Sequence, residues 1–409
     1  MKNRIFIIMS FLIVFSMILA ACGGQDTGEG DEVSGVPEEC AENPDETVCA
    51  VIEPGSTIKI GFAGPMTGDY SAFGIDISNA QLLAVQEAEP LQGFAFELLV
   101  EDTQGSGEGG AAVANLYVAD PDVVAISGHT FSGSTAASIP IYEAAKRPML
   151  SASATRADLT IGNEIFNRIP FTDDIQGTNA GNYLYETLGL TKLAVLHDGD
   201  AYGKGLAEKV MQVFGQAGGE VVAFEAITPG ETDYSAVLTD IEAKGPEGIF
   251  FGGYYPEAAV IANNMPVVGL TDVVLFSDDG TFGVSFIELA GDQAEGAYAT
   301  SALPPSSPEE EAFSVLFEST FGDLPGSLST FSWHGWDVVN ALISAIRETA
   351  VLSDDGNLYI HRDSLVDAVN FLTGFQGLTG EISCTRGECN TAGPTFFIVQ
   401  NGEWVEATK

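Results

Sequence analysis

From Thr57 onward, short continuous apolar runs alternate with segments whose apolar residues recur at helical spacing. The apolar runs are 4 to 8 residues long and rich in β-branched and aromatic residues, which predicts buried strands. In the first half of the chain we expect strands at 57–64, 94–101, 123–127 and 148–151, with helices at 79–88, 110–119 and 135–145. Strands that are apolar throughout, separated by helices, indicate a parallel sheet covered on both faces.

The same alternation begins again after an irregular stretch at 169–174. Here the pattern predicts helices at 177–188, 203–217, 234–243 and 257–264, and strands at 192–197, 220–226, 248–251 and 273–277. A further helix at 336–349 and a hairpin around 380–402 complete the chain. The fold class is therefore α/β, with two similar halves.

The N-terminal segment has the pattern of an export signal. Lys2 and Arg4 precede an apolar run at 5–20, which is about the length of a secretory signal and short for a membrane span. The run ends in Leu-Ala-Ala-Cys at 19–22, which resembles a bacterial lipobox. We therefore expect residues 1–21 to be a lipoprotein signal peptide and Cys22 to carry the lipid. The alternative is an uncleaved anchor helix.

Residues 22–56 contain ten carboxylates and no Lys or Arg, so we expect them to form an acidic, solvated tether. Besides Cys22, the cysteines form two close pairs. In an exported chain these predict the disulfides Cys40–Cys49 and Cys384–Cys389. Neither pair has the two-residue spacing of a zinc knuckle and the four His are scattered, so no metal site is expected.

The formal net charge is −43. So negative a chain lacks the basic surface that nucleic acids require, which excludes them as partners. An acidic field disfavours anionic ligands and favours cations or zwitterions. We interpret the charge mainly as a means of staying soluble in a saline medium.

Five motifs together resemble a known family. They span 60–68 with Phe73-Gly74, 127–134, 197–205, 251–257 and 290–296. In order and spacing they resemble the type I periplasmic binding proteins, specifically the Leu/Ile/Val-binding proteins of branched-chain amino-acid importers, over about 57 to 407. The resemblance implies two Rossmann-like lobes joined by three hinge crossings, with the ligand in the cleft beyond the carboxyl ends of the strands. Lobe one would be 57–172 plus 300–376, and lobe two 173–299 plus 377–409.

An amino acid bound in this cleft needs partners for its carboxylate and its ammonium. The segment 127–134 leaves a strand and enters a helix, so its amides and helix dipole suit a carboxylate, and Ser132 adds a hydroxyl. The alternative is that Ser132 and Ser134 only cap the helix. The resemblance implies that Ala154 and Thr155 contact the main-chain groups of the ligand.

The resemblance also implies that Asp279 pairs with the ammonium, although the family often has Glu there and Asp278 is a close competitor. It places Tyr202, Tyr254 and Phe73 around the ligand. Phe131 occupies a position that is commonly smaller in the family. We expect it to shrink or reshape the side-chain pocket and to alter Leu/Ile/Val selectivity. The alternative for each ring is plain core packing.

These observations predict a monomeric solute-binding lipoprotein outside the cytoplasm, anchored to the cell membrane. It would capture an amino acid, expected to be branched-chain, and deliver it to an ABC transporter permease. Other small solutes, such as aromatic amino acids, amides or urea-like compounds, remain alternatives, as does ligand sensing for a separate signalling partner.

No enzyme activity and no cofactor is expected. No GxSxG elbow occurs. Residues 105–110 match a GxGxxG string, but Asp102 and Glu108 place negative charge where a pyrophosphate would lie. We interpret this segment as a flexible loop.

Overall fold

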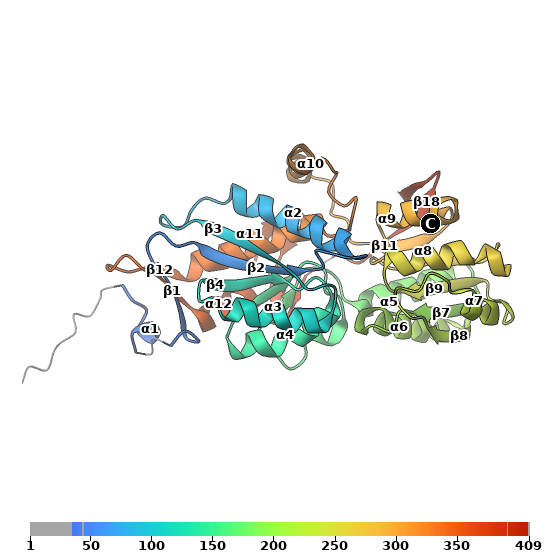
Figure 1. Cartoon of the computed structure of the whole chain (residues 1–409), viewed down its shortest axis with the longest axis horizontal. Coiled ribbons are helices and arrows are strands. Elements are labelled where there is room, and N and C mark those ends of the chain that lie inside the picture. The colour runs from blue at the N-terminus through green and yellow to red at the C-terminus, as the bar shows by residue number, and fades with distance from the viewer. Residues whose placement is uncertain (1–34, 43–44, 391, 408–409) are drawn as a thin grey trace, which may run out of the picture.

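The computed structural model describes residues 35–42, 45–390 and 392–407. They form two lobes, each built on a seven-stranded sheet with helices on both faces (Figure 1). The signal peptide and Cys22 lie outside the described residues. Within the part of the chain that the structure describes, no helix has the length and apolar character to cross a membrane.

The sheet of lobe one has the strand order β16-β17-β6-β5-β4-β2-β3 and is parallel from β17 to β3. The strands are β2 (Ile58–Gly64), β3 (Phe96–Asp102), β4 (Val123–Gly128), β5 (Met149–Ser151), β6 (Phe166–Arg168), β16 (Cys384–Thr385) and β17 (Glu388–Cys389). Every residue of β4 is buried, because this central strand is covered on both faces. Its residues face two cores: Val124 and Ala125 pack in one, and Val123 and Ile126 in the other.

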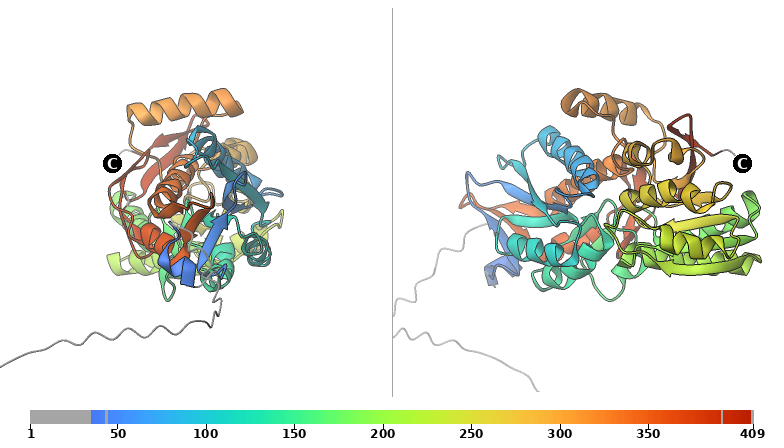
Figure 2. Two further views of the ribbon diagram at one scale, coloured as in Figure 1. Left: turned by 90° about the vertical axis from the view of Figure 1, so that its left-hand side faces the viewer. Right: turned by 45° about the vertical axis from the view of Figure 1, so that its right-hand side comes forward.

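Helices of lobe one cover the two faces of this sheet. On one face lie α2 (Ser71–Glu87), α11 (Ser332–Thr349) and α12 (Arg362–Asn370), and on the other α3 (Gly107–Val118) and α4 (Ser132–Ala144). Helix α10 (Pro308–Phe321) stands outside these layers, above α2 in Figures 1 and 2. The predicted parallel sheet with both faces covered is confirmed.

The sheet of lobe two has the order β19-β18-β11-β10-β9-β7-β8. Its strands are β7 (Lys192–His197), β8 (Glu220–Ala226), β9 (Gly248–Gly252), β10 (Val274–Phe276), β11 (Tyr298–Ser301), β18 (Thr395–Gln400) and β19 (Glu403–Glu406). The helices are α5 (Asp173–Asn182), α6 (Ala201–Ala217), α7 (Ser235–Glu242), α8 (Tyr255–Asn264) and α9 (Val284–Ala290). Strands β7 to β11 are parallel to one another, and β18 and β19 add an antiparallel edge.

The chain crosses between the lobes three times, as expected: after β6, after β11 and between β17 and β18. The structure corrects the position of the last crossing, which the sequence placed at 377. The hairpin β14 (Phe375–Gly377) to β15 (Gly380–Ile382) and the strands β16 and β17 all stay with lobe one. The reason is that β17 pairs with β6, and Ile382, Cys384 and Cys389 are buried in the lobe-one core. The disulfide Cys384–Cys389 closes this hairpin.

The structure also corrects the end of the acidic tether. Strand β1 (Cys49–Ile52) pairs with β13 (Leu358–His361), which also pairs with β12 (Ala350–Leu352). Ala50 and Ile52 are almost fully buried in the lobe-one core, because the apolar run Cys-Ala-Val-Ile can join a sheet despite its acidic surroundings. The predicted Cys40–Cys49 disulfide links this strand to the short helix α1 (Glu38–Glu42), with a Cα–Cα distance of 5.6 Å.

Candidate functional site

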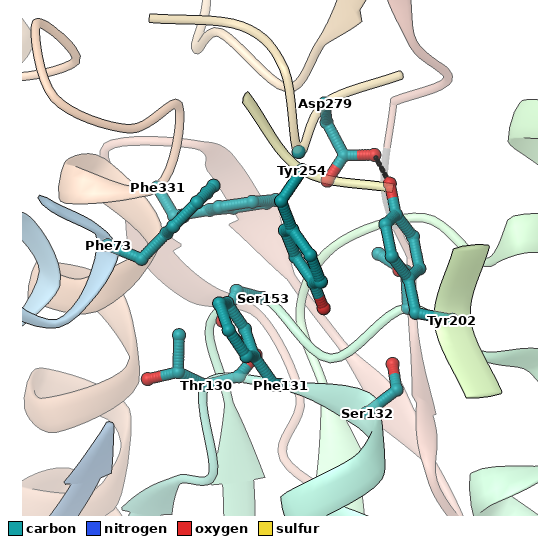
Figure 3. A pocket seen from close by; sticks show the side chains of 11 residues that line it. Phe73, Thr130, Phe131, Ser132, Ser153, Tyr202, Tyr254, Asp279 and Phe331 are labelled. Atoms are coloured by element: carbon teal, nitrogen blue, oxygen red, sulfur yellow. Dashed lines mark hydrogen bonds between the residues drawn. The ribbon is translucent and has the colours of Figure 1, made fainter. Parts of the chain in front are cut away.

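A small cavity lies between the lobes, where the carboxyl ends of β4 and β5 face those of β7, β9 and β10 (Figure 3). Its volume, measured as the space open to the centre of a water-sized sphere, is about 10 Å³. Its lining comprises Phe73, Thr130, Phe131, Ser132, Ser153, Thr155, Tyr202, Tyr254, Asp279, Gly280 and Phe331. Segments far apart in the sequence therefore meet at one place.

Seven of the eight residues expected from the sequence line this cavity: Phe73, Phe131, Ser132, Thr155, Tyr202, Tyr254 and Asp279. Ala154 is fully buried and is not part of the lining. Its amide donates to Ser151 Oγ (3.0 Å) and its carbonyl accepts from Arg168 Nη1 (3.1 Å). The sequence did not point to Thr130, Ser153, Gly280 or Phe331.

On the side of lobe one, the cavity meets the N-terminus of α4. The amides of a first helical turn have no acceptor within the helix, so they can bind an anion. Ser132 Oγ accepts from the Arg156 amide (3.3 Å), which leaves its hydrogen available to a ligand. Ser134 Oγ instead donates to the Phe131 carbonyl (2.9 Å). The two serines therefore differ: Ser134 bonds back to its own helix end, and Ser132 lines the cavity.

On the side of lobe two, Asp279 presents its carboxylate to the cavity. Its Oδ1 accepts from Tyr202 Oη (2.9 Å, Figure 3) and from Gln176 Nε2. Gln176 Nε2 also reaches Thr300 Oγ1 (2.7 Å), which anchors the group to β11. Burial raises the pKa of Asp279, while the hydrogen bonds from Gln176 and Tyr202 act in the opposite direction. A cation arriving at this carboxylate would reverse the effect of burial.

Asp278, the neighbouring acid, has a different role. Its Oδ2 accepts from the Gly253 amide and its Oδ1 from the Gly280 amide, both at 3.0 Å. Burial raises its pKa well above the ordinary value, and the charge of Asp279 adds to the rise. Because both oxygens of Asp278 hold loop backbone, Asp279 is the acid that faces the cavity.

Further carboxyl groups lie behind the lining. Burial raises the pKa of Asp173 to about 8. A hydrogen bond from the Thr155 hydroxyl acts to lower this pKa, and the negative charge of Asp279 acts to raise it. Burial likewise raises the pKa of Asp198 to about 7, with the charges of Asp200 and Glu257 adding to the rise. No Lys or Arg is among the described residues that line the cavity. The site therefore favours a ligand with a positive end.

Aromatic rings from both lobes close the cavity. Phe131 of lobe one stacks on Tyr254 of lobe two, with ring centroids 4.3 Å apart and planes at 24°. The ring centroid of Tyr202, also from lobe two, lies 5.4 Å from that of Tyr254. Two side-chain hydrogen bonds also join the lobes: Tyr70 Oη donates to Glu257 Oε1 (3.0 Å), and the Tyr255 hydroxyl donates to the Asp69 carbonyl. The conformation described is thus closed.

The described residues contain no group of three or more His, Cys, Asp or Glu side chains arranged to hold a metal ion. The acids around the cavity are therefore not a metal centre of that kind within these residues.

Comparison with known proteins places this geometry in context. A family model described as periplasmic binding protein matches residues 57–402. A leucine-, isoleucine-, valine-, threonine- and alanine-binding protein of Pseudomonas aeruginosa is 32% identical over 248 residues, which cover 60% of this chain and 66% of the relative. That alignment spans just under two thirds of the relative's length. A leucine-specific-binding protein of Salmonella typhimurium is 29% identical over 72% of this chain and 79% of the relative.

Solved structures agree over most of the chain. A leucine-binding protein of Thermotoga maritima has a TM-score of 0.78 at 27% identity, covering 86% of this chain and 98% of that one. A branched-chain amino-acid transporter substrate-binding protein of Streptococcus pneumoniae, in complex with isoleucine, has a TM-score of 0.75 at 27% identity, with 85% and 97% covered. The two-lobed fold expected from the sequence is confirmed.

Proposed function

Because the chain belongs to the periplasmic binding protein family, we propose that it is an extracytoplasmic receptor that captures an aliphatic amino acid between its lobes and delivers it to an ABC importer. The relatives are substrate-binding proteins rather than enzymes, which supports a binding role. One observation carries the proposal: a closed cavity in which the Asp279 carboxylate faces the N-terminus of α4.

This arrangement matches the two ends of a dipolar ligand. The ammonium lies against Asp279, beside the Tyr202 hydroxyl. The carboxylate accepts from the first-turn amides of α4 and from Ser132, and contacts the segment that holds Ala154 and Thr155. Each ionic group needs such a partner, because an unpaired charge buried in the cleft costs several kcal/mol. Phe73, Phe131 and Tyr254 surround the side chain.

Ligand capture works through closure of the lobes about the three crossings. A ligand that contacts both walls binds the closed form more tightly than the open form. The ratio of these two affinities determines how far the ligand shifts the equilibrium toward the closed form. The hydrogen bond from Tyr70 to Glu257 forms across the lobe boundary and adds to the closed state. The closed form is then the one presented to the permease.

The proposal includes the anchor expected from the sequence. Cys22 carries a lipid that holds the protein on the outer side of a cell membrane, and the protein works as a monomer beside its permease.

The binding step can be tested on the full-length protein purified in mild detergent. Native mass spectrometry identifies any bound small molecule, and calorimetry then measures binding of a panel of aliphatic and aromatic amino acids, amides and urea. We expect at least one aliphatic amino acid to bind at low micromolar concentration, which corresponds to about 8 kcal/mol. If no amino acid gives heat while an amide or urea does, the proposed ligand class is wrong.

A further inference from the structure

The Phe131 ring takes up the middle of the cleft. Phe131 is the residue directly before α4, and its ring is 5% exposed. It projects from lobe one and stacks on Tyr254 of lobe two, with ring centroids 4.3 Å apart (Figure 3). Rings at this separation are in contact, so no aliphatic group fits between them.

Neighbouring groups hold this ring in place. Phe73 and Tyr70 of lobe one contact it edge to face, with ring centroids at 5.4 Å and 5.8 Å. The backbone of Gly105 lies against its rim: a Cβ added there would be 3.3 Å from Phe131 Cε2 and 3.4 Å from Tyr70 Cδ2. Gly105 has a φ of +66°, a conformation that glycine adopts readily. Gly105, two residues before α3, thus limits how far the ring can move. The structure corrects the expected flexible loop at 105–110, because residues 107–110 form the first turn of α3, which Ser106 caps.

The space left beside the ring is small. The cavity offers about 10 Å³ to the centre of a water-sized sphere, which is about what one water molecule needs. Any amino acid must therefore part the walls as the lobes close on it. Since Phe131 is confined on several sides, the required displacement grows with the size of the side chain of the ligand. Extra methylenes in a filled pocket are unfavourable, in contrast to their usual benefit.

We propose that Phe131, held by Tyr70, Phe73 and Gly105, makes the protein select amino acids with small side chains. Alanine, threonine and valine are ligands of this kind, and leucine and isoleucine are disfavoured. The inference rests on the proposed function, because it assumes that the ligand is an amino acid bound in this cleft. It assigns to Phe131 the role of limiting ligand size.

The test measures alanine, threonine, valine, isoleucine and leucine by calorimetry on the full-length protein and its Phe131→Ala and Phe131→Leu variants. For the unchanged protein we expect alanine or valine to bind at least about tenfold more tightly than leucine, because a single methylene changes affinity by about 10 to 200-fold. In Phe131→Ala the leucine-to-alanine affinity ratio should rise by at least about thirtyfold, and in Phe131→Leu by about tenfold.

The ratio of two affinities measured on one preparation does not depend on the fraction of protein that is folded. Phe317→Leu is the matched control, since Phe317 is a buried ring of α10 that does not line the cavity. Its ratio should change less than about threefold.

Three results would overturn the inference: leucine binding as tightly as alanine to the unchanged protein, a ratio unaffected by either Phe131 variant, or an equal change in Phe317→Leu. The first leaves the proposed function intact. Absence of heat from every amino acid would overturn the proposed function and this inference together.

Discussion

The two walls of the cleft differ in chemistry. Lobe one contributes seven of the eleven lining residues, and all seven are uncharged: Phe73, Thr130, Phe131, Ser132, Ser153, Thr155 and Phe331. Lobe two contributes Tyr202, Tyr254, Asp279 and Gly280, among which is the carboxylate. One wall therefore offers amides, hydroxyls and rings, and the other offers an acid with phenols. Each lobe by itself can satisfy one end of a zwitterion, and closure satisfies both.

The walls are also supported differently. Behind lobe one, the fully buried Arg168 donates to the carbonyls of Ala154 and Arg156, and it pairs with Glu388 at 3.0 Å. Its positive charge is used to fix the loop rather than to bind a ligand. Behind lobe two, Asp278 fixes two loop amides and leaves the acid beside it to face the cavity. Each lobe thus uses a charged group as scaffold, but only lobe two also presents one.

The largest effect should come from removing the charge on lobe two. Asp279→Asn keeps the shape of the side chain and leaves the ammonium without its counter-charge. We expect ligand affinity measured by calorimetry to fall by about 100-fold, because loss of one partner in a buried charge pair costs about 2 to 5 kcal/mol. Asp337→Asn is the matched control: this buried acid of lobe one bonds to the amides of Leu378 and Thr379, outside the cavity lining. A loss below threefold in Asp279→Asn would refute the ammonium assignment.

Changing the pH should give the next largest effect. Burial raises the pKa of Asp279 in the unliganded closed form, whereas a bound ammonium favours its ionised form. A proton therefore competes with the ligand once the pH falls through the raised pKa, at a higher pH than for an ordinary carboxyl. We expect affinity to be weaker at pH 5 than at pH 7.5, a range in which neither end of a free amino acid titrates. Asp279→Asn should flatten this dependence. An affinity that rises as the pH is lowered toward 5 would contradict competition between a proton and the ligand at Asp279.

The smallest effect should come from lobe one, whose donors are several and neutral. Ser132→Ala removes one hydroxyl and leaves the first-turn amides of α4, so affinity should fall about fivefold, corresponding to about 1 kcal/mol. Ser134→Ala is the control, because that hydroxyl bonds to the Phe131 carbonyl and should affect thermal stability rather than affinity. Equal affinity losses in the two variants would show that both serines act only on the helix end.

Much of this site could be predicted because it follows strand ends. Ser132 comes shortly after β4, and Asp279 follows β10 closely, so the topology brings them to one cleft. Phe331 was missed because it directly precedes α11, a helix that the sequence pattern placed four residues too late. Its position depends on how α11 packs against α2, which no local pattern shows.

The differences in the fold have similar causes. The pairing of β17 with β6 joins Glu388 to Arg168, which are 220 residues apart in the sequence. Strand β17 is only two residues long, so it has no recognisable sequence pattern. Helix α10 was also missed, although Ser307, Pro308 and the Glu310 amide form a capped helix start. Phe313 and Phe317 then supply its buried side at a spacing of one turn. That signal was present in the sequence, whereas the β17 pairing was not.

Strand β1 determines where any load from the N-terminus enters the folded protein. It pairs with β13 at the end of lobe one that lies away from lobe two (Figure 1), and the Cys40–Cys49 disulfide links β1 to α1. Tension on the preceding chain is therefore borne by lobe one and does not pass through the crossings. Under the proposed anchor at Cys22, lobe one is therefore the half held at the membrane, and lobe two is the half free to move toward and away from it.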